Sequence, residues 1–286
     1  MSMEWSEITE KSLLERVDEH LQARDTHLPV IDQIGMRVRS VVASGDFDLR
    51  QVETLINQDP VLAAAVMRGA NSAFYRGIHK VTTVGEAVAR IGARQVANLV
   101  LLETQRKNFV SETRDLRELF RALWRHSVAC AAGSEWLARR LRFQEISDHA
   151  FVAGLLHDLG KLLLLRVIDE LRSEDPDANR LTESFTRELL ESFHADRGAM
   201  LMQAWELPEI YCRIAREHHA ERFDPDDVLL VVVRLVDKAC ARLGIGTVHT
   251  PDLDVVASPE ARCVDASELL LAELEVLLED ALELAG

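Results

Sequence analysis

The chain has 286 residues, of which 48% are hydrophobic and only 5% are aromatic, and it contains 7 prolines and 13 glycines. An aliphatic composition with few turn-forming residues favours helices over a turn-rich β fold. The formal net charge is −15. Binding to a nucleic-acid backbone requires clustered cations that replace counterions, so we expect no nucleic-acid partner. Arg139, Arg140 and Arg142 are interpreted as a solvated helix face.

The sequence also predicts a cytoplasmic protein. Its most apolar run, Val228 to Val236, contains Arg234 and is far shorter than the roughly 20 residues of a membrane span. The N-terminus carries acidic residues where a signal peptide would be basic. The four cysteines are scattered without a Cys-x-x-Cys pair, which is typical of buried, reduced thiols. We therefore expect neither export nor a membrane.

Apolar residues recur at helical spacing through the first hundred residues. Residues 1–27 are predicted as a helical leader that ends at Leu28-Pro29, and residues 28–110 as a lobe of short helices. These helices are expected from Val30 to about Ser44, from a cap at Asp48 through Ile56, from Pro60 to Asn71, from a cap at Thr82 or Thr83 to Gly92, and over about 93–108.

A polar stretch at 111–115 predicts a helix-to-helix hinge, after which residues 111–244 form a second lobe. Helices are expected at 116–141, within the apolar segment 150–166, and at about 183–204, 208–219 and 226–243. Residues 172–182 are expected to form a loop. The remaining residues, 245–286, are predicted as a tail in which 244–263 are irregular and 266–284 form an acidic amphipathic helix. Because no segment alternates like a strand, we expect an all-α fold, a helical bundle in two packed lobes.

An unusual His157-Asp158 doublet interrupts the apolar segment 150–166, between Gly154 and Gly160-Lys161. Burying an ionised carboxylate without a partner is costly, so Asp158 needs a cation, a metal ion or several hydrogen-bond donors. A structural pair satisfied by the backbone is the alternative interpretation of the doublet alone.

Further histidines and one aspartate stand beside apolar residues on the predicted helices. The full set is His126, His157, Asp158, His194, His218, His219 and Asp237. Imidazole and carboxylate are ligands that Fe, Mn, Ni, Co and Zn accept. We therefore expect one ion held by His126, His157, Asp158 and Asp237, with a second ion completed by the other histidines and bridged by Asp158. Adjacent helical residues point about 100° apart, so His218 and His219 are not expected to bind one ion together. A purely structural polar network remains the alternative.

The order of His126, His157-Asp158 and Asp237 resembles the signature of the HD superfamily of helical, metal-dependent phosphohydrolases. The stretch from about Leu28 to Gly244 more closely resembles the HDOD domain, the HD-related output domain of bacterial signalling proteins. The matching segments are Leu28-Pro29, Gln58-Asp59-Pro60, Ala70-Asn71-Ser72-Ala73-Phe74-Tyr75, Val81 to Gly92, Leu123 to Ser127, Ala153 to Lys161 and Trp205 to Pro208. The resemblance implies an HD-like C-terminal lobe.

The resemblance implies a regulatory output module that acts through a protein partner. The alternative is a metal-dependent phosphohydrolase acting on a nucleotide or phosphoester, in which Asp158 and Lys161 would be catalytic. Enzymes of the family that hydrolyse cyclic-di-GMP carry Gly-Tyr-Pro after their His-His pair, whereas this chain has Ala220-Glu221-Arg222. We therefore expect no such activity. Leu269, Leu270, Leu274, Leu277 and Leu278 form a stripe that could dock a partner helix, although such a stripe more often packs on its own domain. Ala70 and Ala73 are expected at a tight helix contact.

Overall fold

The computed structural model describes residue 15 and residues 33–43, 48–75, 77, 79–111, 113–174 and 182–285. These ranges contain helices and no β-strand, which confirms the all-α prediction. They divide into two compact units, of which the larger contains Ser111–Leu278 and the smaller contains Val30–Val110 with Glu279–Gly286. The predicted leader lies outside the described residues except for Glu15. None of the described helices has the length and apolar character needed to cross a lipid bilayer.

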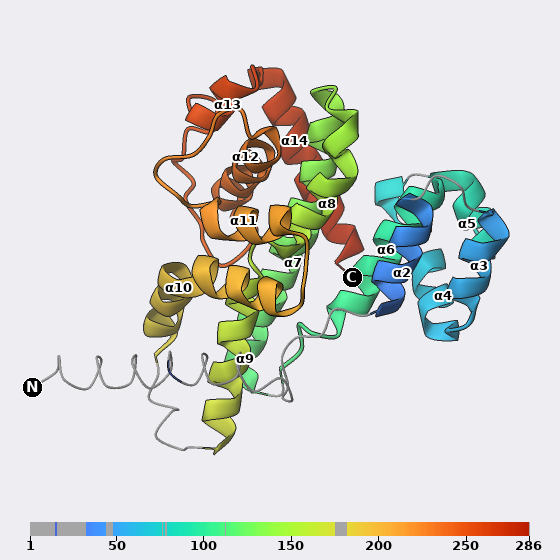
Figure 1. The fold of residues 1–286 in the computed structure, drawn as a ribbon, viewed down its shortest axis with the longest axis horizontal. Helices are drawn as coiled ribbons and strands as arrows, with labels where there is room; N and C mark the ends of the chain where they lie inside the picture. The colour runs from blue at the N-terminus through green and yellow to red at the C-terminus, as the bar shows by residue number, and fades with distance from the viewer. Residues whose placement is uncertain are drawn as a thin grey trace, which may run out of the picture. The chain divides into compact units, whose positions relative to one another are not determined.

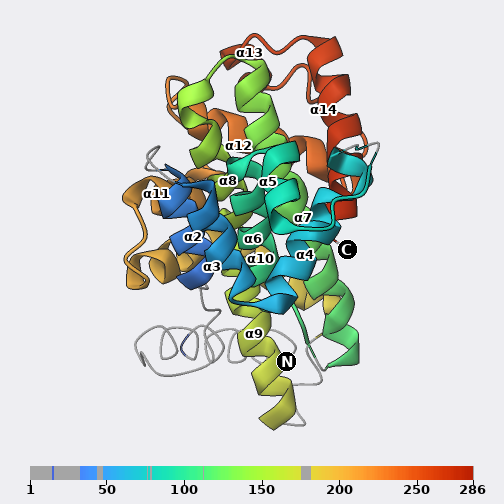
Figure 2. The same cartoon turned by 90° about the vertical axis from the view of Figure 1, so that its right-hand side faces the viewer.

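The smaller unit is organised around one helix, α6 (Ala93–Arg106). The helices that contact it are α2 (Gln33–Ala43), α3 (Leu49–Asn57), α4 (Pro60–Ala70) and α5 (Val84–Ile91), and a short 3-10 turn, η1 (Ala73–Tyr75), follows α4. Figure 2 shows these helices gathered around α6. Their apolar faces meet in a core in which Val38, Val52, Ile56, Val66 and Val96 are fully buried. Hydrophobic burial thus drives the short helices together, since helices this short are marginal alone.

Side-chain caps fix where these helices start. The Asp48 side chain accepts a hydrogen bond from the Arg50 backbone N–H, and Asp59 accepts from Val61 and Leu62. Thr83 accepts from the Glu86 N–H. Such caps satisfy backbone donors that have no partner inside the helix. The predicted caps at Asp48 and Thr83 are therefore confirmed.

Asn71 closes the loop between α4 and α5. Its Nδ2 donates to the Val81 carbonyl oxygen at 2.9 Å, and its Oδ1 accepts from the Val81 N–H at 2.8 Å. The amide thus bonds across ten residues rather than to the end of its own helix. Ala70 is fully buried, as a tight helix contact requires, whereas Ala73 is exposed, so the contact predicted for Ala73 is wrong.

The larger unit is organised around α7 (Arg114–Arg140), a helix of 27 residues. The other elements are η2 (Gln144–Ile146), α8 (Ser147–Leu156), α9 (Leu159–Glu174), α10 (Glu183–Ala204), α11 (Glu209–Glu217), α12 (Val228–Leu243), α13 (Pro259–Cys263) and α14 (Glu268–Ala281). The short 3-10 turn η4 (Leu282–Leu284) follows α14 and belongs to the smaller unit. Helix α7 contacts α8, α9 and α12, while α10 contacts α9 and α11 (Figure 1). This arrangement brings helices distant in sequence to one place.

The C-terminal part contradicts one prediction and decides between two interpretations of the leucine stripe. Residues 244–263 are not wholly irregular, because Ser258 caps the short helix α13 and Pro259 occupies its first turn. Of the two interpretations of the leucine stripe, the structure favours packing on its own domain over an exposed docking face. Leu274 and Leu278 are fully buried, whereas Leu269 is 71% exposed. The acidic helix α14 therefore packs most of this stripe within the protein.

Candidate metal centre

The His157-Asp158 doublet lies where α8 ends and α9 begins, and two glycines position it. A Cβ atom on Gly154 would overlap the backbone of Cys130 on α7. A Cβ atom on Gly160 would overlap the His194 carbonyl oxygen and come within 2.7 Å of the Gly198 nitrogen, both on α10. Only glycine permits such close backbone approach. The two glycines therefore allow the doublet to pack closely between α7 and α10, the helices that carry other polar residues of the site.

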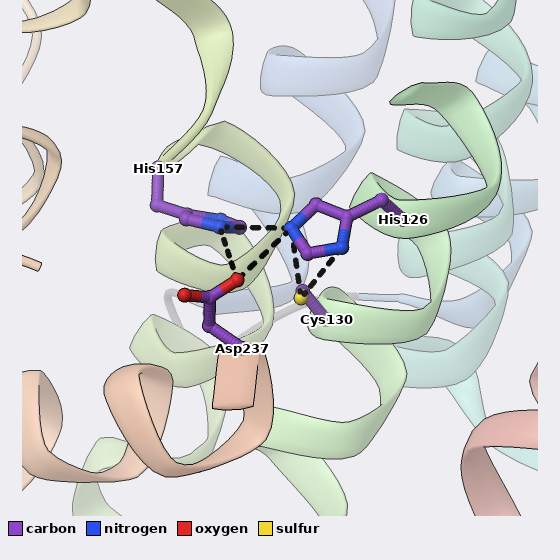
Figure 3. Close-up of side chains that lie close together, drawn as sticks. All are labelled: His126, Cys130, His157 and Asp237. Atoms are coloured by element: carbon purple, nitrogen blue, oxygen red, sulfur yellow. Dashed lines mark hydrogen bonds and ion pairs between the residues drawn. The ribbon is translucent and has the colours of Figure 1, made fainter. Parts of the chain in front are cut away.

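One group of side chains gathers beside the Oδ2 atom of Asp158. His126 on α7 and Asp237 on α12 approach His157, as Figure 3 shows. The Nε2 atom of His126 lies 3.3 Å from Asp158 Oδ2 and 3.3 Å from Asp237 Oδ1. The Nε2 atom of His157 lies 3.8 Å and 3.9 Å from the same two oxygens. We call His126, His157 and Asp237 the first half of the site.

A second group gathers beside the other oxygen of Asp158. The Nε2 atoms of His194 on α10 and His218 lie 3.3 Å and 3.4 Å from Asp158 Oδ1. His219 belongs to the same cluster, and its side chain is 44% exposed. We call His194, His218 and His219 the second half. Asp158 thus faces one half with each oxygen, as a bridging carboxylate would.

The backbone fixes the tautomer of four of these imidazoles. The Nδ1 atoms of His126, His157, His194 and His218 lie 3.0, 2.9, 2.6 and 2.7 Å from the carbonyl oxygens of Ile245, Gly154, Leu190 and Ala215. A carbonyl only accepts, so each Nδ1 carries the proton and donates it. In the neutral ring, Nε2 then presents a lone pair toward the site. This is the arrangement found for histidines that bind metal ions.

The lone pairs meet in two close contacts. His126 Nε2 lies 3.2 Å from His157 Nε2, and His194 Nε2 lies 3.2 Å from His218 Nε2. Two unprotonated nitrogens at this distance repel one another unless a proton or a metal ion lies between them. Two nitrogens bound about 2.0–2.1 Å from a tetrahedral zinc ion would stand about 3.3 Å apart. The spacing in both halves therefore fits a metal ion.

Asp158 itself has the environment of a metal ligand. Both of its oxygens are buried without a well-formed hydrogen bond. Its nearest cation is Lys161 on α9, whose Nζ lies 3.0 Å from Oδ2 and 3.2 Å from Glu191 Oε1. Burial alone would raise the pKa of the Asp158 carboxyl, but Lys161 and His157 hold it well below its usual range. The site thus contains a buried anion that one ammonium group neutralises only in part.

The two halves differ in the direction in which their surroundings shift the pKa values of the imidazoles. Burial alone would lower the pKa of His126, but hydrogen bonds to Asp158 and Asp237 raise it well above its ordinary value. Burial lowers the pKa of His218 to about 4 despite the hydrogen bond to Asp158. Burial likewise lowers the pKa values of His194 and His219. The second half is therefore neutral at pH 7, whereas His126 holds a proton where an ion would otherwise bind.

The structure brings together every side chain that the sequence analysis selected. Those are His126, His157, Asp158, Lys161, His194, His218, His219 and Asp237. One premise about them is wrong. Helix α11 ends at Glu217, not at about residue 219, and His218 caps it with helical backbone angles. His218 and His219 nevertheless both offer a nitrogen to the same cluster. Both can face Asp158.

Sequence reasoning missed Cys130 as a neighbour of this site. Its Sγ lies 3.5 Å from His126 Nε2 (Figure 3) and 3.7 Å from Cys240 Sγ. Cys130 stands four residues after His126, and residues at that spacing share a helix face. The spacing of four residues from His126 could therefore have predicted that Cys130 lies beside the site.

A cavity of about 70 Å³ opens beside the site. Its lining includes His126, Lys161, Glu191, His219 and Asp237. Glu191 is 40% exposed, so the rim reaches solvent. A space of this size admits water or a small polar group, and it borders both halves through His126 and His219.

Comparison with known proteins places the chain in a family. A model of the HDOD domain matches residues 28–221. The chain belongs to the HDOD family. This HDOD chain is 25% identical over 220 residues to a curated protein of Treponema pallidum, covering 76% of the chain but only 40% of that relative.

Two solved structures share the fold of this HDOD chain. An HDOD domain protein of Geobacter sulfurreducens, of unknown function, superimposes with a TM-score of 0.72 at 22% identity, covering 93% of this chain and 95% of its own. A Shewanella amazonensis protein named as a metal-dependent phosphohydrolase gives a TM-score of 0.67 at 21% identity, covering 95% and 99%. The predicted resemblance and the HD-like fold are thus confirmed.

Proposed function

We propose that this chain is a signalling module that acts through a protein partner and whose larger unit binds two divalent transition-metal ions. The observation that carries the metal proposal is the pair of 3.2 Å contacts between Nε2 atoms, one in each half. Membership of the HDOD family supports the signalling role. The ligand types suit Fe, Mn, Ni, Co or Zn.

Each half would hold one ion, and Asp158 would bridge them. His126, His157 and Asp237 would bind the first, and His194, His218 and His219 the second. Metal ions at such a site supply Lewis acidity and lower the pKa of bound water. The protein's own contribution is orientation, because four backbone carbonyls hold the rings by their Nδ1–H groups. Lys161 offsets part of the carboxylate charge.

Elemental analysis tests the metal proposal. The chain is purified without added metal, and a second sample is dialysed against Mn²⁺, Fe²⁺ or Zn²⁺ and then freed of excess ion. We expect two ions per chain in at least one of these preparations. A chain that holds no ion in any of them would refute the proposal.

A metal-dependent phosphohydrolase is the second candidate, and Lys161 favours it. Lys161 lines the cavity together with His219 and Asp237, so a cation stands where a phosphoryl oxygen would enter. We expect no turnover of cyclic-di-GMP, because Glu221, Asp224 and Asp226 occupy the segment after the His-His pair and repel a dianion. The assay uses Mn²⁺ or Fe²⁺ with cyclic-di-GMP and with p-nitrophenyl phosphate, beside an Asp158→Ala control. Turnover that the control abolishes would identify an enzyme.

A further inference from the structure

Arg234 is a buried cation in the larger unit that the metal-binding set leaves unused. It lies on α12, interrupts a run of valines and leucines, and is only 6% exposed. A buried guanidinium is costly unless acceptors satisfy its N–H groups. The partners of Arg234 therefore indicate which part of the protein requires it.

One side of the guanidinium holds the end of α11. Arg234 Nη1 lies 3.0 Å from the carbonyl oxygen of Glu217, 2.8 Å from that of His218 and 3.0 Å from that of Ala220. Carbonyls at a helix C-terminus lack partners within the helix and carry its negative dipole end, so a cation stabilises them. The three acceptors enclose the His218–His219 dipeptide from both sides.

The other side of the guanidinium is anchored on Glu260 in α13. Arg234 Nε and Nη2 each lie 2.8 Å from Glu260 Oε1, and Lys238 Nζ lies 2.6 Å from Oε2. Burial would raise the pKa of Glu260, but hydrogen bonds from Lys238 and Arg234 lower it. The Phe223 ring covers the guanidinium, with its centroid 4.3 Å from Cζ. Arg234 therefore has one position in which all its partners are satisfied.

We infer that Arg234, clamped by Glu260, is a positioning residue that holds His218 and His219 in the geometry that binds the second ion. The inference rests on the proposed function. Helix α12 carries Arg234 one turn before Asp237, so one helix supplies a ligand to the first half and the backbone anchor of the second. Loss of the clamp releases residues 218–220 and leaves His126, His157 and Asp237 held by their own contacts.

The test compares metal content in four proteins. Arg234→Lys keeps the charge but cannot satisfy three carbonyls and Glu260 at once, and Glu260→Gln removes the anchor's charge while Lys238 can still donate to the amide oxygen. Arg242→Met is the matched control, because Arg242 lies on the same helix and pairs with Glu275 at 3.1 Å, away from the site. We expect two ions in the wild type and control. Both clamp variants should retain one ion and bind the second about 10–100-fold more weakly.

Two further measurements distinguish a variant that is misfolded from a failure of the inference about Arg234 and from a failure of the proposed metal binding. Near-ultraviolet circular dichroism and cooperative melting verify that the variants are folded; if Arg234→Lys is not, Glu260→Gln decides. Hydrogen–deuterium exchange of the metal-free proteins across residues 214–224 should be faster in the clamp variants than in the control. Two tightly bound ions in a folded clamp variant would overturn the inference, as would unchanged exchange. A wild type without metal would refute the proposed function instead, and the exchange measurement would still decide whether Arg234 holds this segment.

Discussion

The two halves of the candidate metal site both present histidines to Asp158 but place them in opposite electrostatic surroundings. His126 lies 3.3 Å from two carboxylates, Asp158 and Asp237. His218 contacts Asp158 alone and has neighbouring imidazoles on its other sides. In the first half the ion pairs overcome desolvation and favour a proton, whereas in the second half desolvation prevails. Histidines that face the same carboxylate therefore need not be equally ready for a metal ion.

The largest effect is expected from the one residue that both halves share. Asp158→Asn should reduce metal content from two ions to none, because each half loses its only contact with the bridging carboxylate. Elemental analysis measures this loss, with Asp196→Asn as control because Asp196 is exposed on α10. Retention of one tightly held ion would show that the halves bind independently and that Asp158 is no bridge.

Single-ligand variants should separate the halves. His126→Gln is expected to lose the first ion and keep the second, while His218→Gln is expected to do the reverse, each with an affinity loss above about 100-fold for the affected ion. Calorimetric titration with Zn²⁺ measures both sites. His149→Gln is the control, since His149 contacts Tyr211 outside the site. Loss of both ions in either variant would contradict the division into halves.

Proton release should distinguish the halves in the wild type. An ion entering the first half displaces the proton held on His126, so the affinity for this ion should rise by up to about tenfold per pH unit as the pH approaches the raised pKa of His126. The second half binds through imidazoles that are already neutral, and its affinity should be nearly constant over the same range. Titrations in buffers of different ionisation enthalpy count the protons released. One released proton at each site would contradict the contrast.

The metal-free protein should reveal the same contrast through its stability. The folded pKa of His218, about 4, lies below the ordinary value near 6.5, so the unfolded chain binds more protons between these limits. The contribution of His218 to the free energy of unfolding is therefore complete above about pH 6.5 and is lost as the pH falls toward 4. His126 has a raised pKa, so its contribution is complete below about pH 6.5 and is lost at high pH. Melting curves of His218→Gln should therefore show a smaller loss on acidification than wild type.

The smallest effect is expected from the two glycines. Gly160→Ala would push against His194 and weaken the second half, and Gly154→Ala would push against α7 beside Cys130 and weaken the first. Each should cost about 1–3 kcal/mol of stability through overpacking. Thermal melting combined with metal titration measures both effects. If Gly160→Ala lowered the affinity for both ions equally, the glycine contacts would act on the whole site and not on one half.

The sequence predicted the site well because its ligands are polar residues on apolar helices, a pattern that is visible without coordinates. It predicted the helices equally well wherever a cap such as Asp48 or Thr83 marks the start. The short helix α13 was missed because five residues are too few to show a period. The expectation for His218 and His219 was too strict: α11 ends at Glu217, two residues before the predicted end, and both side chains offer a nitrogen to one cluster. The role inferred for Arg234 was missed because three of its acceptors are backbone carbonyls, which no residue type reveals, and the fourth, Glu260, is 26 residues away in the sequence.

The side-chain amide of Asn71 makes the loop between α4 and α5 sensitive to deamidation. Val81 both donates to and accepts from this one side chain, at 2.8 Å and 2.9 Å. Deamidation would turn Asn71 into a carboxylate of the same shape that can only accept, which sets two oxygens against each other at the Val81 carbonyl. Arg90, 3.3 Å from Oδ1, would hold that carboxylate in place. Slow hydrolysis of one amide during storage would thus unfasten the loop between α4 and α5 without breaking the chain.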